Sequence, residues 1–411
     1  TVGNAPPAYA SAITYTQTTL PTSTGPVPSL SVQPNAGNNQ IRPENKYDAE
    51  AGLEVNMLKN RLGFDFTYYN SRVIDQIVQL TVPASTGAIS KLINAGELRS
   101  TGFEASIHGR PVSNKNFNWD VVLNIGSNKT KVRKLGNGVK EVVYFSGEQN
   151  AARVVAVEGE RVGDIYVYPR LTNNKGEYVI GSNGLYVIDN SKYMKVGNIM
   201  PRLIGGISNS INWNRFSLEC MIDYRFGGEM VSPAVKYNIG AGMFQSTMQF
   251  RDAEHGGLPY YLDNAGVRVL LASHQSTAPA GQQVQHDGIL LEGVDATGTK
   301  NNTLTDAASY YMNMYGWGPN SLNENGMVFR NSYVKMRELV VTYKLPAKNL
   351  KKALINEVHF SLIGRNLFYF YRTLKHIDPE TAIGSSWSRQ GIDEGSMAAN
   401  RSIGFAIRAR F

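Results

Sequence analysis

The chain has 411 residues, of which 42% are hydrophobic and only 18% are charged, below the roughly 25% charged residues of soluble domains. The absence of any run of about 18 apolar residues excludes a transmembrane helix and leaves a membrane β-barrel open. The single cysteine, Cys220, excludes a disulfide framework and a cysteine-based zinc site. The net charge is +8, and the basic residues are dispersed along the chain rather than clustered.

Alternating apolar and polar residues predict β-strands from residue 47 onward. Between Tyr47 and Met57 the odd positions are apolar or aromatic and the even ones are mostly acidic. A strand with this period of two has one apolar and one polar face. The same pattern predicts eight further strands: those beginning near residues 62, 101, 117, 207 and 216, then a strand at 332–345, and two more at 357–370 and 399–411.

The strand at 332–345 departs from this rule. Its apolar positions Leu339 and Val341 share a face with two basic residues, Lys335 and Arg337. A regular strand would place all four side chains on the same side.

The connections between the nine predicted strands alternate in length. The short ones are 59–61, 112–116, 214–215 and 346–356, and the long ones are 78–97, 135–202, 230–331 and 371–398. A soluble sandwich has no reason to gather every long loop at one end, whereas transmembrane β-barrels have short periplasmic turns and long extracellular loops. We therefore predict an extracellular loop at 1–46, leading into barrel strands and loops at 47–411.

Aromatic residues are expected in two bands at opposite strand ends, as interfacial girdles require. The polar faces, with Glu54, Asp65 and Asp223 among them, must then line the interior of the barrel, because ionised side chains are costly against lipid. The band near the short turns comprises Phe117, Trp119, Trp213, Phe216 and Tyr343, and the band near the long loops comprises Tyr68, Tyr69, Tyr224, Phe226, Tyr333, Phe368 and Tyr371.

Several short motifs in a fixed order resemble the SusC/RagA group of TonB-dependent outer-membrane transporters. The most specific is Gly364-Arg365-Asn366-Leu367-Phe368, followed by Asp378-Pro379-Glu380. The chain also ends in Phe411, and a terminal aromatic resembles the assembly signal of outer-membrane barrels. Earlier motifs are Arg42-Pro43-Glu44-Asn45, Asn60-Arg61-Leu62, Thr67-Tyr68-Tyr69-Asn70, Asn94-Ala95-Gly96, Ser100-Thr101-Gly102-Phe103-Glu104 and the stretch from Ser332 to Pro346.

The resemblance implies an all-β, transmembrane antiparallel barrel of 22 strands with an N-terminal plug inside it. This chain offers about nine strands and nothing that resembles the plug. Nine strands alone would leave two unpaired edges in lipid. We therefore expect the chain to be the C-terminal part of a longer polypeptide.

The same resemblance implies active import of oligomeric nutrients across the outer membrane of a Gram-negative bacterium. The implied partners are a SusD-like surface lipoprotein that caps the barrel, TonB acting through a plug that is absent from this chain, outer-membrane lipid, and an oligosaccharide or peptide as substrate. A dimer of transporter–lipoprotein pairs fits this picture. No cofactor and no metal are expected.

The loop 230–331 is the best candidate for substrate contact, because flat aromatic faces beside amide groups suit sugar rings and peptide backbones alike. The loop 371–398 is a second candidate. The alternative is that these aromatics pack the loop on itself or on the lipoprotein cap. The candidate contact residues are Tyr237, Tyr260, Tyr261, Tyr310, Tyr311, Trp317 and Asn320 in the first loop, with Trp387 and Arg389 in the second.

Two other classes of protein stay open. One is a passive or structural outer-membrane barrel, such as a porin or adhesin, and the other is a soluble β-rich carbohydrate-binding protein. An enzyme is not expected, since no nucleophile or second carboxylate is spaced for an acid–base pair. Nucleic-acid binding is disfavoured, because the loop aromatics alternate with Asn and Gly rather than with basic residues.

Overall fold

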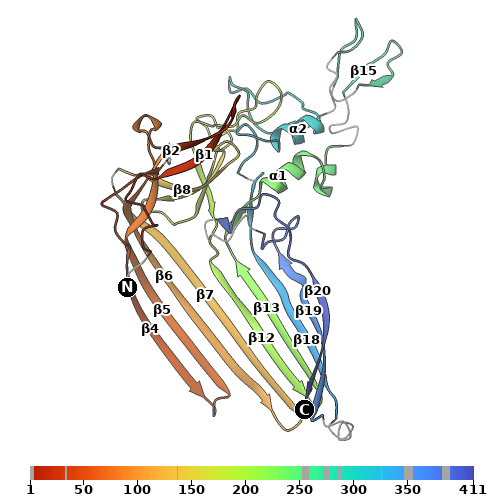
Figure 1. The fold of residues 1–411 in the computed structure, drawn as a ribbon. Helices are drawn as coiled ribbons and strands as arrows, with labels where there is room; N and C mark the ends of the chain where they lie inside the picture. Colours follow the sequence, from red (N-terminus) through yellow and green to blue (C-terminus); the bar gives the residue numbers. More distant parts are fainter. Residues whose placement is uncertain are drawn as a thin grey trace.

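The computed structural model describes residues 4–32, 35–136, 138–251, 259–271, 277–285, 288–324, 326–346, 355–381 and 389–411. Nine long strands form one curved antiparallel sheet in the order β20-β19-β18-β13-β12-β7-β6-β5-β4 (Figure 1). Their bounds are β4 (Asn45–Met57), β5 (Leu62–Thr81), β6 (Ser90–Ser113), β7 (Phe117–Leu135), β12 (Leu203–Trp213), β13 (Phe216–Phe226), β18 (Tyr333–Lys344), β19 (Glu357–Arg372) and β20 (Ser402–Arg410).

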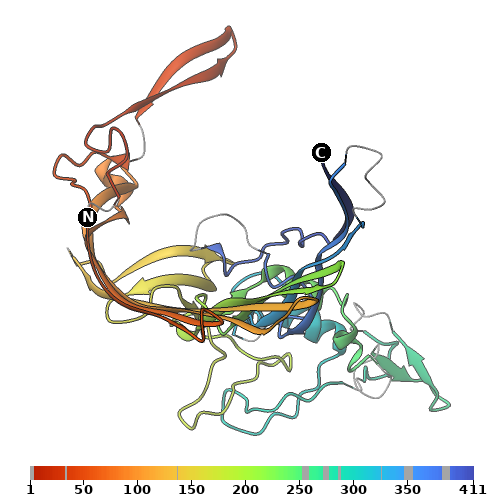
Figure 2. The same ribbon diagram turned by 90° about the horizontal axis from the view of Figure 1, so that it is seen from below.

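All nine predicted strands are therefore confirmed. Each neighbour in the sheet is also the next long strand along the chain, which is the up-and-down order of a membrane barrel. The sheet is an open arc rather than a closed barrel, with β4 and β20 as its edges (Figure 2). A two-residue strand, β3 (Asn35–Ala36), pairs with β6 beside the arc.

The connections gather by length at opposite ends of the sheet. The short connections at 59–61, 112–116 and 214–215 lie at the lower end in Figure 1, which we call the turn end, and the long ones leave the sheet at the upper end, the long-loop end. One connection is shorter than predicted: β5 and β6 continue as paired strands through much of 78–97, and only 82–89 joins them. That joint contains the 3₁₀ turn η1 (Ala84–Thr86).

The segment 1–46, predicted as a loop, contains a hairpin of β1 (Tyr15–Thr22) and β2 (Gly25–Val32). The connection 135–202 likewise folds into a four-stranded sheet, and the connection 230–331 into short helices and hairpins. These elements are β8 (Glu141–Gly147), β9 (Ala152–Val157), β10 (Asp164–Val167), β11 (Met194–Asn198), β14 (Glu229–Val231), α1 (Pro233–Gly240), η2 (Gln245–Met248), β15 (Tyr260–Leu262), β16 (Arg268–Leu270), α2 (Ala307–Met314) and β17 (Val328–Arg330).

Each helix of the described chain is too short and too polar to cross a bilayer. Both nevertheless have satisfied N-termini. In α1 the Ser232 side chain accepts a hydrogen bond from the Val235 N–H, and Pro233 sits at the first helical position, where no N–H is needed. In α2 the Asp306 carboxylate caps the Ser309 N–H in the same way.

Strand register gives the sheet an apolar face. Residues paired across antiparallel strands have their side chains on the same side of the sheet. Following such partners from strand to strand therefore gives a row of side chains on one face. One such row crosses eight neighbouring strands and is apolar throughout: Val55, Phe64, Ile107, Leu123, Ile207, Ile222, Met336 and Phe368.

The adjacent row, one residue along each strand, lies on the opposite face and is polar. Its members are Glu54, Asp65, Ser106, Asn124, Gly206, Asp223, Lys335 and Tyr369. The predicted division of the strands into one apolar and one polar face is thus confirmed.

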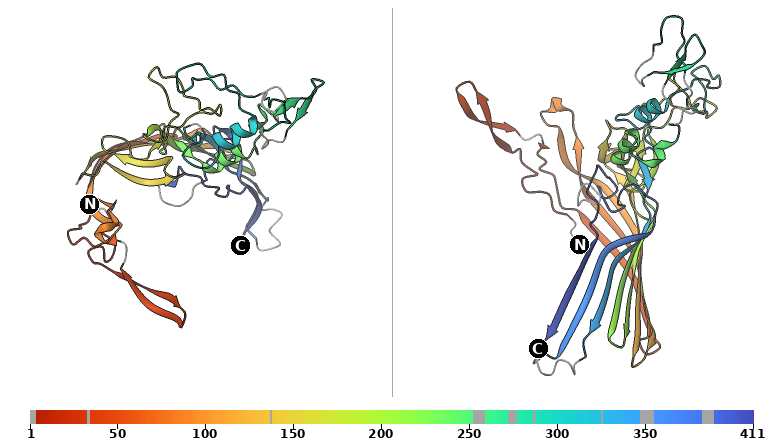
Figure 3. Two further views of the ribbon diagram at one scale, coloured as in Figure 1. Left: turned by 90° about the horizontal axis from the view of Figure 1, so that it is seen from above. Right: turned by 90° about the vertical axis from the view of Figure 1, so that its right-hand side faces the viewer.

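The polar face is the concave one. The segment 373–381 lies on the concave side of the arc in Figures 2 and 3. Two residues of this segment contact the polar row, because Glu380 pairs with Lys335 and Asp378 accepts a hydrogen bond from Tyr369. The apolar rows therefore lie on the convex side, where a barrel wall meets lipid.

Aromatic residues mark both ends of the apolar face. At the turn end, one row contains Phe117, Trp213, Phe216, Tyr343 and Phe360. At the long-loop end, Phe66, Tyr68, Phe103, Tyr224 and Tyr371 occupy the same face. Phe216 and Tyr224 are eight residues apart, or about 26 Å of strand, close to the roughly 25 Å apolar band of such barrels.

Two predicted members of the second aromatic band face the other way. Tyr69 pairs with Glu50 and Tyr333 pairs with Arg225, so both belong to the polar face. The Tyr69 ring lies over Gly102, where an added Cβ would come within 2.4 Å of the phenol oxygen. A glycine is needed there because the ring and the backbone approach so closely.

The face assignment predicts opposite outcomes for two charged substitutions on β13. Ile222→Arg should block assembly, because Arg at the bilayer midplane costs roughly 2–4 kcal/mol. Ser217→Lys, on the polar face, should be tolerated. The measurement is the heat-modifiable fraction of the protein in isolated outer membranes, and equal amounts for the two variants would contradict the assignment.

Candidate functional site

A bulge in β18 explains the basic residues that are out of phase in the sequence. The register with β13 shifts between Met221 and Ile222, and the register with β19 shifts between Met336 and Glu338. An extra residue on one strand reverses the alternation of sides beyond it. Leu339 and Val341 therefore stay on the apolar face, while Lys335 lies on the polar face.

Arg337, at the bulge, binds acidic residues from two other segments. Its Nε lies 2.5 Å from Asp223 Oδ2 on β13, and Nη1 lies 3.1 Å from Glu380 Oε2 in the connection after β19. Nη1 also donates to Asn366 Oδ1 at 2.8 Å. Asn366 has a φ of 52°, in the left-handed region that Asn tolerates better than most residues. The bulge thus directs one guanidinium toward β13, β19 and the following loop.

Lys335 completes this arrangement, which we call the Glu380 clamp: Asp223, Tyr333, Lys335, Arg337 and Glu380. The Lys335 side chain is 2% exposed and pairs with Glu380. The Tyr333 hydroxyl lies 3.2 Å from Glu380 Oε1. Two cations on a barrel strand therefore hold one loop carboxylate against the concave wall.

Asp378 shapes the turn that presents Glu380. Its Oδ1 accepts hydrogen bonds from the Tyr369 hydroxyl at 2.5 Å and from the Glu380 N–H at 3.1 Å. Its Oδ2 accepts the Ala399 N–H at 2.9 Å. The motif residues Asn366, Asp378 and Glu380, spread over fifteen positions of the sequence, meet at one place in the fold.

The charge state of Glu380 follows from its surroundings. Burial acts to raise the pKa of its carboxyl, but hydrogen bonds from Arg337 and Lys335 outweigh burial and hold the pKa at about 2. The carboxylate is therefore ionised at neutral pH, where it can pair with Lys335 and Arg337.

The three long connections at the long-loop end share one core. Val154 and Ile165 of β9 and β10, Val231 and Met327 around β14 and β17, and Ile392 beyond β19 pack in a single buried cluster. Val231 and Ile392 also form a parallel bridge. We call this unit the loop body. The β8–β11 sheet lies on the concave side of the arc (Figure 3).

A buried ion pair ties two of these connections together. Lys236 on α1 is fully buried, with its Nζ 3.3 Å from Glu148 Oε2 and 3.1 Å from Asn323 Oδ1. Burial lowers the pKa of Lys236 and proximity to Glu148 opposes that shift. The pair links the β8–β9 turn to α1. Breaking it would leave an unpaired buried charge.

The predicted contact residues divide into packed and accessible groups. The Tyr237 hydroxyl is held by Glu148. Tyr260 is buried, under the Arg268 guanidinium. Tyr310 and Tyr311 pack around Tyr315 on α2, where burial raises the pKa of both phenols. These four side chains have packing or hydrogen-bond partners within the long connections, and substrate contact by them stays a prediction.

The other predicted residues are less enclosed. Tyr261 is half-buried on β15, and Arg389 is exposed. Trp317 is 68% exposed and Asn320 is exposed beside it; together they line a groove of about 570 Å³. Trp387 lies outside the described residues. Substrate contact by any of these side chains stays a prediction.

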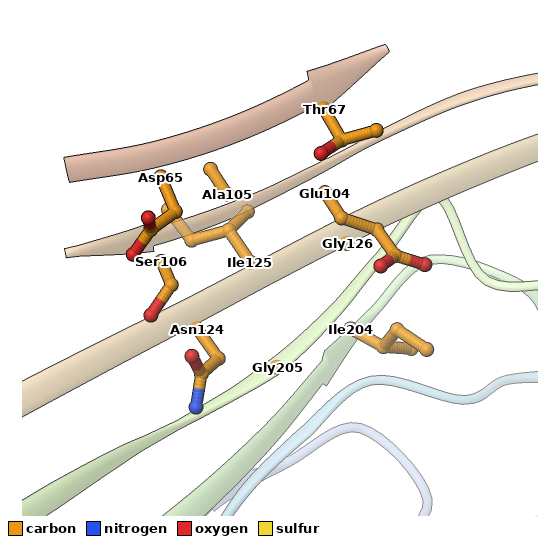
Figure 4. Close-up of a pocket in the computed structure, with 10 residues that line it drawn as sticks. All are labelled: Asp65, Thr67, Glu104, Ala105, Ser106, Asn124, Ile125, Gly126, Ile204 and Gly205. Carbon is orange, nitrogen blue, oxygen red and sulfur yellow. The ribbon is translucent and has the colours of Figure 1, made fainter. Parts of the chain in front are cut away.

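A second groove lies on the barrel wall itself. Figure 4 shows Asp65, Thr67, Ser106 and Asn124 along it, from β5, β6 and β7, with Glu104 beside them. Its volume is about 430 Å³. Within the described ranges, no group of three His, Cys, Asp or Glu side chains is placed to hold a metal ion.

Comparison with known proteins adds to this geometry. Residues 3–178 match the family model described as TonB dependent receptor-like, beta-barrel. The chain is 24% identical over 88% of its length to the TonB-dependent receptor P26 of Formosa agariphila, covering 34% of that protein. It is 26% identical to the TonB-dependent receptor SusC of Bacteroides thetaiotaomicron, over 46% of this chain and 20% of that one.

The same fold is found in a solved structure described as the RagAB peptide transporter. The TM-score is 0.65 with 17% identity, over 97% of this chain and 38% of that one. This chain has the β-barrel fold of TonB-dependent receptors and is similar to SusC and to the RagAB structure. Such receptors are outer-membrane proteins, so the predicted location is confirmed. The chain spans between about a fifth and two fifths of the length of these relatives.

Removing the clamp carboxylate should loosen its loop. Glu380→Gln leaves the buried Lys335 charge without its partner, a change that costs roughly 3 kcal/mol or more for buried pairs. Amide hydrogen exchange of residues 374–381 in the receptor should accelerate. Glu338→Gln is the matched control, because its pair with Arg365 is largely exposed. Equal exchange rates in the two variants would show that Glu380 does not hold this loop.

Acid should release the same loop. The folded-state pKa of Glu380 lies below its unfolded value of about 4.5, so its stabilising effect is complete above pH 4.5. That effect is lost as the pH falls toward 2. Protection of residues 374–381 should fall over this interval in the wild type and stay flat in Glu380→Gln, and parallel curves for the two proteins would contradict the assignment.

Proposed function

We propose that this chain forms part of the wall and mouth of a receptor that imports oligomeric nutrients across the outer membrane. The observation that carries the proposal is the concave polar face, to which Glu380 attaches the connection after β19, itself packed against the other long connections. A polar interior suits a hydrated path, and a packed loop body suits selective binding at its mouth. The likeness to SusC favours nutrient import over other receptor roles.

The open edges of the arc support the presence of further strands in the working receptor. β4 and β20 have one partner each in the long sheet. Unpaired backbone groups cost several kcal/mol each in hydrocarbon. We propose that additional strands pair with β4 and β20 and close the barrel around a plug that TonB pulls.

A SusD-like lipoprotein is the proposed partner at the long-loop end, which we place on the cell exterior. Large apolar side chains are exposed to solvent there: Met243 is 72% exposed and Met248 is 62% exposed. Exposed apolar groups of this size are typical of protein contact surfaces. The RagAB structure is a complex described as a peptide transporter, and peptides and glycans are both candidate cargo for this receptor.

TonB dependence separates this proposal from a passive barrel. Cells that express the receptor should accumulate its labelled oligomer, and deletion of tonB should reduce accumulation to the level of receptor-deleted cells. The reason is that a plugged barrel needs force to open, whereas a porin does not. Uptake that persists at the same rate without TonB would favour the passive barrel and defeat the proposal.

A further inference from the structure

The groove beside Trp317 is built from two distant segments. Residues 181–188 of one long connection form one wall, and residues 312–321 of another form the opposite wall. Both walls stand on one buried cluster, in which Leu185 and Ile188 pack with Tyr311 and Met314. The groove is therefore a feature of the folded loop body and not a gap between independent loops.

The backbone next to Trp317 is held by hydrogen bonds. The next residue, Gly318, has a φ of 104° and donates its N–H to the buried Glu148 carboxylate at 3.1 Å. The Ser321 hydroxyl donates to the Gly318 carbonyl at 2.8 Å. The backbone that carries the exposed indole is thus attached to the Lys236–Glu148 pair. Anchoring the backbone that carries the indole lowers the conformational entropy that is lost when a ligand binds.

The lining is neutral and rich in amides and hydroxyls. None of the residues that line the groove in the described part of the chain is charged. Arg170 lies over the ring of Tyr186, which lines the groove, but its guanidinium is paired with Glu324. Within the described ranges, no hydrogen bond engages the side chains of Asn320 and Ser182. Their polar groups are therefore available to a ligand.

We propose that this groove is a capture subsite for a neutral oligosaccharide. The apolar face of a sugar ring can stack on Trp317, while the ring hydroxyls bind Asn320, Ser182 and the free amide donor of Asn183. An uncharged lining offers no partner for carboxylates, sulfates or peptide termini. A volume near 570 Å³ accommodates two or three sugar units. The proposal rests on the proposed import function and narrows its cargo.

The test uses the full-length receptor purified in detergent. Calorimetric titration with neutral hexasaccharides of glucose, mannose and xylose is compared with a hexauronate and an uncharged hexapeptide. At least one neutral glycan should bind. Trp317→Ala should weaken its binding roughly tenfold, and Asn320→Ala should weaken it severalfold. The matched control is Leu270→Ala, which removes another side chain exposed on the long loops, outside the groove.

Three results would overturn the subsite. They are failure of all the neutral glycans to bind, unchanged binding in Trp317→Ala, and tighter binding of the hexapeptide or the hexauronate. If unchanged glycan binding in Trp317→Ala came with loss of lipoprotein association, the groove would be a protein contact instead. TonB-dependent uptake that survives any of these results would leave the import function standing, so the two proposals fail separately.

Discussion

The structure depends on one constraint: across eight strands, every pair in register must keep its side chains on the same side. A slip of one residue anywhere would carry Glu54 or Asp223 to the convex face and Ile222 to the concave one. The rows show no such slip along their length. The arc, the two aromatic bands and the polar interior all follow from this continuity.

The bulge in β18 shows how the constraint is kept where the sequence breaks it. Without the extra residue, Lys335 would face lipid in line with Leu339. With it, the two basic side chains reach the concave face and bind Glu380. A local irregularity in the ladder thus serves two purposes, since it preserves the apolar surface and attaches the loop body to the wall.

Much of this arrangement could be predicted from the sequence because it depends on local period. The nine strands and their two faces follow from alternation alone, and most of the aromatic bands do too. The clamp could not be predicted, because a bulge depends on pairing with both neighbours. The mismatched phase of Lys335 and Arg337 and the motif containing Glu380 were both visible in the sequence, but neither showed that these side chains meet. The sequence also could not show that Tyr311 is buried and Trp317 exposed. Both lie in one aromatic loop, and only tertiary packing gives them different exposures.

The shared core of the loop body has a consequence for how such receptors diversify. Ala152, Val231 and Ile392 come from three connections yet occupy one cluster, so none of these connections can change its buried apolar residues without disturbing the other two. Replacing one long connection with that of a relative would leave cavities in the shared core or overpack it. New ligand preferences should therefore arise by concerted change or by exchange of the whole assembly, while the strands beneath remain the same.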